Sequence, residues 1–359
     1  MAVYKIFAAA DATLYSAHPS QSTGLDEILE VGCKNSLIPS SVASSADDIR
    51  RSVILFSNTD LNTAYSLVSG SPWASNLRLY FANAENLTTT YNLEVRQVSQ
   101  SWSMGTGKFL DIPESKNGVS WVNAAESTTW TSPTDYFNTV GGGNWISSIN
   151  VTQSFGYKDN KDLNVNVKSI TEKWLVDGQP NYGFLVKMSS SVEENTGSYL
   201  NLNFFSVDTH TIYPPTLEFK WADSIYNTGS LSVAGGSDTI VTLRNNTGVF
   251  KNDTGMYLMK INVRDKYPAR QFTDTSVYLA NKALPSSSYW ALQDVKTEEM
   301  VVDFDTTYTK ISCSPVGSFF SIYMNGLEPE RYYKVLVRVD LPTGESIDID
   351  GNNIFKITR

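Results

Sequence analysis

The side chains that most often do acid–base chemistry are scarce in this chain. It has two histidines, His18 and His210, and neither lies in a GxSxG or HExxH sequence. His210 falls in a Thr-rich loop between two expected strands, which favours a solvated loop residue over a general base. The adjacent carboxylates Glu193-Glu194 and Glu298-Glu299 point in opposite directions on an extended chain, so we expect solvated edges rather than a glycosidase pair. The sequence therefore predicts no catalytic residue and no enzymatic activity.

Two short runs carry oxygen ligands that suit a hard cation. They are Asp159-Asn160-Lys161-Asp162 and Asp348-Ile349-Asp350-Gly351-Asn352. Neither has the full twelve-residue calcium loop or its terminal glutamate. Asp and Asn also favour turns, because their side chains bond to their own backbone. We therefore expect turns, no metal ligands and no cofactor, with a structural Ca²⁺ in the N-terminal half as the alternative that stays open.

Aromatic side chains gather in the loop-rich region between residues 99 and 145. Trp130 and Trp145, with Tyr136 and Phe137, lie among Gly, Ser and Thr, which favours exposed positions. The run Gly141–Gly143 would let this loop rearrange on contact. We expect these four aromatic residues to contact a partner protein or to stack on a sugar ring. On this interpretation, Trp130→Ala weakens binding or assembly and leaves the fold intact.

Charge and composition exclude several classes of protein. The chain has 359 residues and a formal net charge of −9, and its Lys and Arg residues are scattered, which argues against nucleic-acid binding. Arg50-Arg51 could form an anion site, but an ion pair with an acidic neighbour is the simpler interpretation. Cys33 and Cys313 lie in different expected domains, so we expect two reduced thiols. No run of ~18 apolar residues occurs, so we expect no membrane insertion.

Alternation of apolar and polar residues predicts β-strands along the first 222 residues. A short helical turn with Ile170 and Trp174 on one face ends at Asp177-Gly178, and Pro214-Pro215 forces extended backbone before the last strand. The expected strands are residues 4–7, 11–15, 28–31, 47–56, 76–81, 91–98, 164–167, 184–188, 200–207 and 216–221, with residues 145–151 leading back into the sheet. The pattern indicates one antiparallel β-sandwich over residues 1–222.

The amino-acid composition changes after residue 222. A Ser- and Gly-rich linker is expected at residues 223–237, and a second set of strands follows at residues 239–243, 255–263, 276–280, 299–304, 309–313, 319–324, 332–339 and 354–357. Asn325-Gly326 and Asp350-Gly351 are tight-turn dipeptides. Leu327-Glu328-Pro329 before Tyr332 resembles the corner of fibronectin-type-III-like modules, where a buried tyrosine hydroxyl bonds to backbone. We therefore predict an all-β chain whose second sandwich, residues 238–359, is Ig- or fibronectin-III-like.

Residues 9–222 also contain a series of short motifs in a characteristic order. The motifs are Asp11-Ala12-Thr13-Leu14-Tyr15, Leu29-Glu30-Val31-Gly32, Arg50-Arg51-Ser52-Val53-Ile54-Leu55-Phe56, Ala74 with Leu77, Leu79 and Tyr80, Val95 to Trp102, Val119-Ser120-Trp121, Val165 to Trp174, Asn181-Tyr182-Gly183-Phe184, Phe204-Phe205-Ser206 and Pro215-Thr216-Leu217-Glu218-Phe219. In this order they resemble the DNRLRE family of jelly-roll-like β-sandwich modules. The resemblance implies that Trp102 and Trp121 occupy core positions.

The DNRLRE resemblance also implies a role. The family is a structural and adhesion module of cell-surface, carbohydrate-active and tailed-phage virion proteins. The N-terminus has no apolar segment typical of a signal peptide, and the stretch from Tyr323 to Tyr333 with Phe355-Lys356-Ile357 looks similar to terminal domains of tailed-phage structural proteins. We therefore expect a structural protein of a phage virion, assembled in the host cytoplasm and packed against other virion proteins and copies of itself. The alternative is a carbohydrate-binding adhesin or receptor-binding module for host surface glycans.

Overall fold

The computed structural model describes most of the 359 residues, and these form two compact units. The described residues are 2–34, 48–68, 70–87, 90–109, 111–131, 141–193, 200–235, 238–268 and 281–359. The N-terminal unit comprises Ile6–Leu67 and Ala74–Glu218, and the C-terminal unit comprises Met1–Lys5, Val68–Trp73 and Phe219–Arg359. The limits expected at residues 222 and 237 stay predictions.

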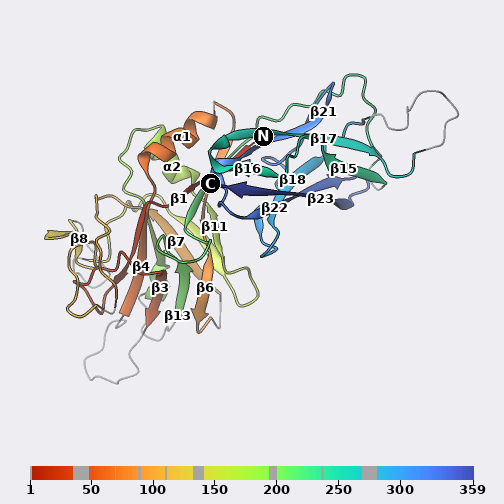
Figure 1. Ribbon diagram of the computed structural model, residues 1–359. Helices are drawn as coiled ribbons and strands as arrows, with labels where there is room; N and C mark the ends of the chain where they lie inside the picture. The colour runs from red at the N-terminus through yellow and green to blue at the C-terminus, as the bar shows by residue number, and fades with distance from the viewer. Residues whose placement is uncertain are drawn as a thin grey trace. The chain divides into compact units, whose positions relative to one another are not determined.

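An eight-stranded antiparallel sheet forms the centre of the N-terminal unit. Its order is β10-β7-β12-β4-β3-β13-β6, and β2 pairs with β4 outside this path. Part of it, β4, β3, β13 and β6, is seen side by side in Figure 1. The strand bounds are β2 Ala10–Tyr15, β3 Ile28–Lys34, β4 Asp48–Leu55, β6 Phe81–Glu85, β7 Tyr91–Gln97, β10 Val151–Phe155, β12 Phe184–Met188 and β13 Leu200–Phe205.

The described residues before position 222 also form a second sheet and three α-helices. The second sheet has the order β1-β14-β5-β11, and β8 pairs with β9 in a separate hairpin. The bounds are β1 Ala2–Phe7, β5 Trp73–Leu79, β8 Asn123–Ala125, β9 Thr128–Thr129, β11 Leu163–Asn166, β14 Thr216–Trp221, α1 Asn58–Val68, α2 Lys168–Leu175 and α3 Ser190–Glu193. The expected helical turn is confirmed as α2, whose Ile170 and Trp174 are buried.

Strand β12 is covered on both faces, because all five of its residues are buried. On one face, Phe184 lies 4.9 Å from the Trp174 ring of α2 and 6.0 Å from Phe56, centroid to centroid. On the other face, Leu185 belongs to a separate apolar cluster with Trp102 and Trp121 from the long loop region. A loop layer therefore covers a sheet face that a simple sandwich leaves to solvent.

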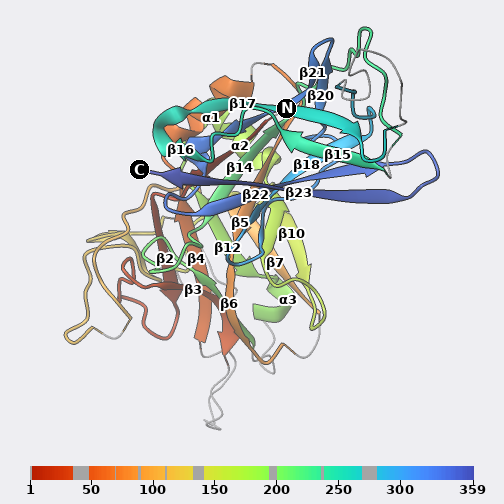
Figure 2. The same cartoon turned by 45° about the vertical axis from the view of Figure 1, so that its right-hand side comes forward.

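Two sheets share one apolar core in the C-terminal unit. Their orders are β15-β17-β21-β20 and β16-β23-β22-β18-β19. Figure 2 shows β22 and β23 side by side. The bounds are β15 Thr239–Leu243, β16 Val249–Lys251, η1 Asn252–Thr254, β17 Met256–Asp265, β18 Ser288–Asp294, β19 Met300–Val302, β20 Ser312–Ser314, β21 Gly317–Tyr323, η3 Met324–Gly326, β22 Tyr332–Asp340 and β23 Ser346–Thr358.

The core of the C-terminal unit follows from alternation along its strands. Every second residue is buried from Met259 to Val263 in β17 and from Tyr333 to Val339 in β22, and both rows enter the same cluster. Across the two sheets, the rings of Trp290 and Phe320 stack with centroids 4.8 Å apart. The all-β prediction is confirmed, while the jelly-roll and Ig-like assignments stay predictions. One departure from antiparallel pairing is β16, which runs parallel to β23.

Two local expectations need correction, and a third concerns residues that the structure does not describe. Asp350-Gly351 is not a turn but lies inside β23, next to a register shift in its pairing with β22. The tyrosine that bonds back to the corner is Tyr333, which is 2% exposed and donates to the Glu328 carbonyl at 3.0 Å, whereas Tyr332 is 54% exposed. The strand expected at residues 276–280 lies outside the described residues.

Candidate functional site at the buried charge cluster and Trp145

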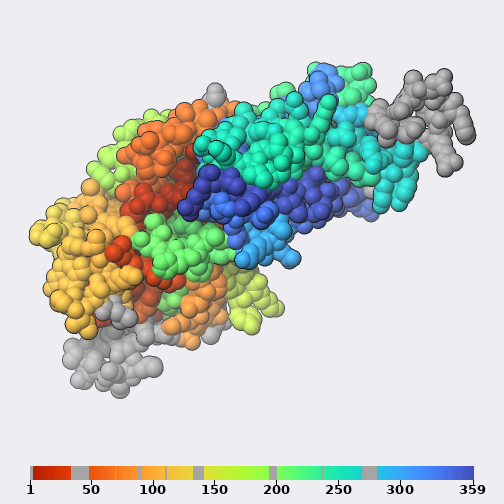
Figure 3. Space-filling model, in the orientation of Figure 1, coloured from red at the N-terminus to blue at the C-terminus, as the bar shows by residue number. Residues whose placement is uncertain are grey.

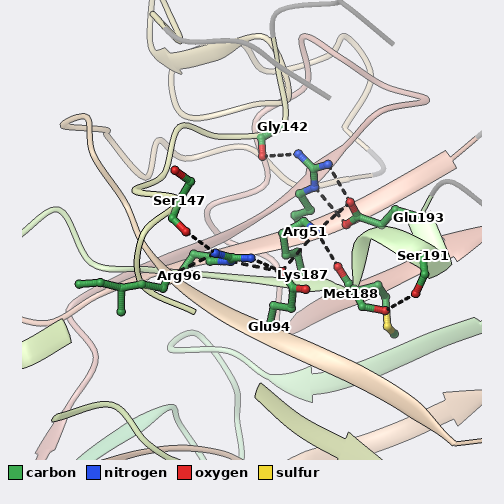
Figure 4. Close-up of polar contacts among 11 residues, drawn as sticks. Arg51, Glu94, Arg96, Gly142, Ser147, Lys187, Met188, Ser191 and Glu193 are labelled. Carbon is green, nitrogen blue, oxygen red and sulfur yellow. Dashed lines mark hydrogen bonds and ion pairs between the residues drawn. The ribbon is translucent and has the colours of Figure 1, made fainter. Parts of the chain in front are cut away.

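Charged side chains form a row across one face of the N-terminal sheet. Lys187 of β12 lies opposite Glu94 of β7, and the pairing of Ser52 with Val186 places Arg51 of β4 opposite Lys187. Residues on either side of this row, such as Leu185, are buried and apolar. Lys187 and Glu94 carry opposite charges and attract each other across the sheet. Arg51 and Lys187 carry like charges, and both contact the carboxylate of Glu193. We call Arg51, Glu94, Arg96, Lys187 and Glu193 the charge cluster (Figure 4).

The centre of the charge cluster is an ion pair with no solvent contact. Arg51 Nε and Nη2 donate to the two carboxylate oxygens of Glu193 at 3.1 and 2.9 Å, and both side chains have an exposed fraction of 0%. Helix α3 carries Glu193 over the sheet, and Val192 and Glu193 donate their backbone N–H groups to Ser189. A bidentate pair of this kind fixes the guanidinium in one plane.

Lys187 extends the charge cluster towards its rim. Its ammonium lies 3.2 Å from Glu193 Oε2 and 3.9 Å from Glu94 Oε2, and it donates to the Met188 carbonyl at 2.7 Å. Arg96 closes the rim, because it donates to Glu94 at 2.8 Å and to the Ser147 carbonyl at 3.0 Å. Positive and negative groups therefore alternate from the interior outwards, which offsets the cost of removing each from water.

The charge cluster also holds the loop that ends at Trp145. Arg51 Nη1 donates to the Gly142 carbonyl at 2.9 Å, and the guanidinium lies 4.9 Å from the Trp121 ring and 5.2 Å from the Trp145 ring. A Cβ on Gly142, whose φ is 73°, would lie 2.3 Å from Arg51 Nη1. The glycine at this position thus permits a close approach, and the loop is anchored to the sheet.

The structure describes two of the four aromatic residues that were expected at a surface. Trp130 is 1% exposed and donates its indole N–H to the Ser120 carbonyl at 3.1 Å, so its expected surface position is corrected to a core position. Trp145 is partly buried and bridges to Val98. Tyr136 and Phe137 lie outside the described residues. A contact role for Trp145 therefore stays a prediction.

Several expectations about charged and aromatic residues can now be compared with the structure. Trp102 and Trp121 are buried, as the family resemblance implied. The ion-pair interpretation is confirmed for Arg50, which pairs with Asp48 at 2.7 Å and with Glu30. The expected solvated edge at Glu193 is wrong, because this carboxylate is fully buried. Lys187 gave a signal for this buried cluster in the sequence, because it is a charged residue within the apolar strand Phe184–Met188.

The first oxygen-rich run and His210 are not arranged as a metal or acid–base site. In the first oxygen-rich run, Lys161 donates to the carbonyls of Gly156, Tyr157 and Asp159, so its ammonium supplies the cation of that turn. The His210 side chain is 88% exposed. Among the described residues, no three Asp, Glu, His or Cys side chains form a group that could hold a metal ion.

Two carboxyls have raised pKa values: Asp11 on strand β2, which is buried, and Asp26, which is partly buried. Burial raises the pKa of Asp11 to about 8, although the Val207 N–H donates to it at 2.7 Å. Burial raises the pKa of Asp26 to about 6, against the opposing effect of the Phe109 N–H. Asp208 adds like charge near Asp11. Because burial disfavours the charged form of a carboxyl, both groups keep their proton to a higher pH than an exposed aspartate does.

Comparisons of the chain with protein-family models, with curated proteins and with solved structures gave no match. The DNRLRE resemblance is therefore an expectation from the residues alone. In the described part of the chain, none of the helices has both the length and the apolar character needed to span a bilayer.

Proposed function

We propose that the chain is a non-enzymatic structural component of a tailed-phage virion, in its tail, neck, baseplate or a fibre-associated position, and that it acts by protein–protein packing. One observation carries this proposal. The charge cluster has its centre sealed from water, at 0% exposure for Arg51 and Glu193, and it ties three strands, α3 and the Gly142 loop together. Charged groups used in this way support a rigid scaffold.

Packing against neighbours also needs apolar groups at the surface. In the N-terminal unit, Ile112 and Tyr157 are 97% and 77% exposed on loops. Side chains of this kind contribute to protein interfaces when a partner covers them. Repetition of modest contacts over many identical copies would add avidity. The phage setting itself rests on the family resemblance given by the sequence.

Antibody labelling of intact particles tests this proposal. An antibody raised against the whole chain should decorate one morphological position in negative-stain images of the phage that encodes it. Particles that stay unlabelled, although the same antibody binds particles disrupted with detergent and containing the chain, would mean an internal location and would contradict a surface appendage. Absence of the chain from disrupted particles would remove the proposal altogether.

A second candidate function is carbohydrate binding. The observation in its favour is a pocket in the C-terminal unit whose lining combines two cationic residues with one aromatic and three aliphatic residues. Sites for sugars combine polar groups with an apolar surface in this manner. A glycan array with the purified chain tests this role, since a purely structural subunit should bind no sugar.

A further inference from the structure

A pocket of about 310 Å³ opens on the sheet β15-β17-β21-β20. Arg244 follows β15, Lys260 lies on β17 and Phe319 lies on β21, and all three line the pocket. Strand β17 reaches the surface on the face drawn in Figure 3. The volume is at the small end of the range of about 300–1,000 Å³ typical of small-molecule sites. It therefore suits a group about the size of one ring.

Arg244 and Lys260 are direct neighbours across two strands. The backbone N–H of Arg244 donates to the Lys260 carbonyl at 2.7 Å, and the register Leu243↔Ile261 sets the two residues opposite each other. Like charges opposite each other in an antiparallel pair repel. No acidic side chain lines the pocket, and neither cation makes an ion pair with any residue in the described ranges. An anion bound between them would relieve this repulsion.

Asn281, a further polar residue of the pocket wall, is bonded within the protein. The Asn281 carboxamide accepts from the Val263 N–H at 2.8 Å and donates to the Val316 carbonyl at 3.3 Å. Its position depends on Gly317, where an added Cβ would lie 2.7 Å from Asn281 Nδ2. Arg244 and Lys260 supply the positive charge of the pocket, so they select for a negatively charged ligand.

The rest of the pocket wall is apolar. Phe319 lies directly opposite Lys260 in the register of β17 and β21. Leu258, two residues before Lys260 on the same face of β17, is 37% exposed, and Val316 is 72% exposed. A ligand that fills this space must present an apolar surface beside its negative group. The ring of a sugar acid does so, with its carboxylate on one side and its C–H bonds on a face.

We propose that this pocket binds a carboxylate-bearing sugar residue of an acidic glycan. Arg244 and Lys260 hold the carboxylate, and Phe319, Leu258 and Val316 contact the C–H face of the ring. An aspartate or glutamate side chain from a protein is smaller and would leave most of the volume empty. This inference rests on the second candidate function and does not depend on a place in the virion.

Calorimetry with the full chain tests the proposal against matched ligands. The probes are tetramers of galacturonate, mannuronate and guluronate, sialyllactose, the methyl ester of the galacturonate tetramer, and hexaglutamate. We expect at least one acidic sugar to bind, and its binding to weaken when salt rises from about 0.05 M to about 0.5 M. Because charge-assisted hydrogen bonds would be lost, we expect Arg244→Gln, Lys260→Gln and, where galacturonate binds, the ester to weaken binding about tenfold or more. Lys251→Gln, an exposed lysine of β16 outside the pocket, should leave it unchanged.

Four results would overturn the proposal. They are no binding of any acidic sugar, equal binding of a galacturonate tetramer and its ester, unchanged binding after both pocket substitutions, and tighter binding of hexaglutamate than of the sugars. The array separates this failure from that of the candidate function. If the chain binds neutral glycans but no acidic ones, the result supports carbohydrate binding and contradicts only the pocket assignment.

Discussion

Arg51 and Glu193, which are 142 residues apart in the sequence, meet as a two-bond ion pair at 3.1 and 2.9 Å with neither side chain exposed. The pair joins the central strand β4 to helix α3, and through Gly142 it reaches the loop before Trp145. A buried pair adds less stability than its short distances suggest, because both charges lost their water. Removal of one partner is strongly destabilising, because the other charge then stays buried without a counter-charge.

We expect Glu193→Gln to lower the free energy of unfolding by about 3–5 kcal/mol, because Arg51 and Lys187 would lose their buried counter-charge. Urea unfolding followed by tryptophan fluorescence measures this change. The matched control is Asp348→Asn, which removes the partner of Arg338 at an exposed pair and should cost about 0–1 kcal/mol. Equal losses for the two variants would contradict the burial assigned to Glu193.

Trp130→Ala should destabilise the N-terminal unit by about 3–5 kcal/mol, because it empties a fully buried site and leaves the Ser120 carbonyl without its donor. Trp145→Ala, at a partly buried ring over Arg51, should cost less, about 1–2 kcal/mol. Thermal unfolding of both variants compares them. If the Trp130→Ala protein is as stable as the parent, the result contradicts the burial of Trp130.

Part of the fold could be predicted from the sequence, and the burial of Trp130 could not. The strands at 184–188 and 216–221 and the helical turn at Ile170 and Trp174 were predictable, because apolar periodicity reports local structure directly. The position of Trp130 was not, since its Gly-, Ser- and Thr-rich surroundings look like a surface loop. Its burial comes from a loop layer packed on a distant sheet face.

The charge cluster could not be predicted either, because its contacts join residues that are far apart in the sequence. Its ion pairs join β4, β7, β12 and α3, and no local pattern states that Glu193 will lie over Arg51. Helix α1 was also missed, because its polar sequence lacks a strong apolar stripe. The pocket at Arg244 and Lys260 could not be predicted, because the two residues become neighbours only through the register of β15 and β17.

The buried acid Asp11 predicts that stability falls as pH rises. Its pKa is about 8 in the folded chain and close to 3.9 when unfolded, so between these values the folded state holds a proton that the unfolded state has released. The free energy of unfolding therefore decreases from about pH 4 to about pH 8, and Asp26 acts in the same direction up to about pH 6.

Asp11→Asn cannot lose this proton, so its urea midpoint should fall less between pH 5 and pH 8 than that of the parent chain. Unfolding curves at the two pH values give the comparison, with exposed Asp253→Asn as the control. Parallel decreases in the parent and in Asp11→Asn would show that another group carries the pH dependence.

The cation pair of the C-terminal unit gives a test that needs no ligand. Because Arg244 and Lys260 lie opposite each other without an acidic neighbour in the pocket, Lys260→Gln should raise the free energy of unfolding by about 0.2–1 kcal/mol at low salt. The gain should shrink at about 1 M salt, where screening is strong. A loss of stability that salt does not change would mean that the two cations do not repel.

Quantitative mass spectrometry of purified phage particles tests the central claim most directly. If the chain is a structural component, density-banded particles of the phage that encodes it will contain the chain in a fixed ratio to the major capsid protein. That ratio will persist through repeated banding and a high-salt wash. A chain present in infected cells but absent from the particles, or removed by the wash in varying amounts, would contradict the claim.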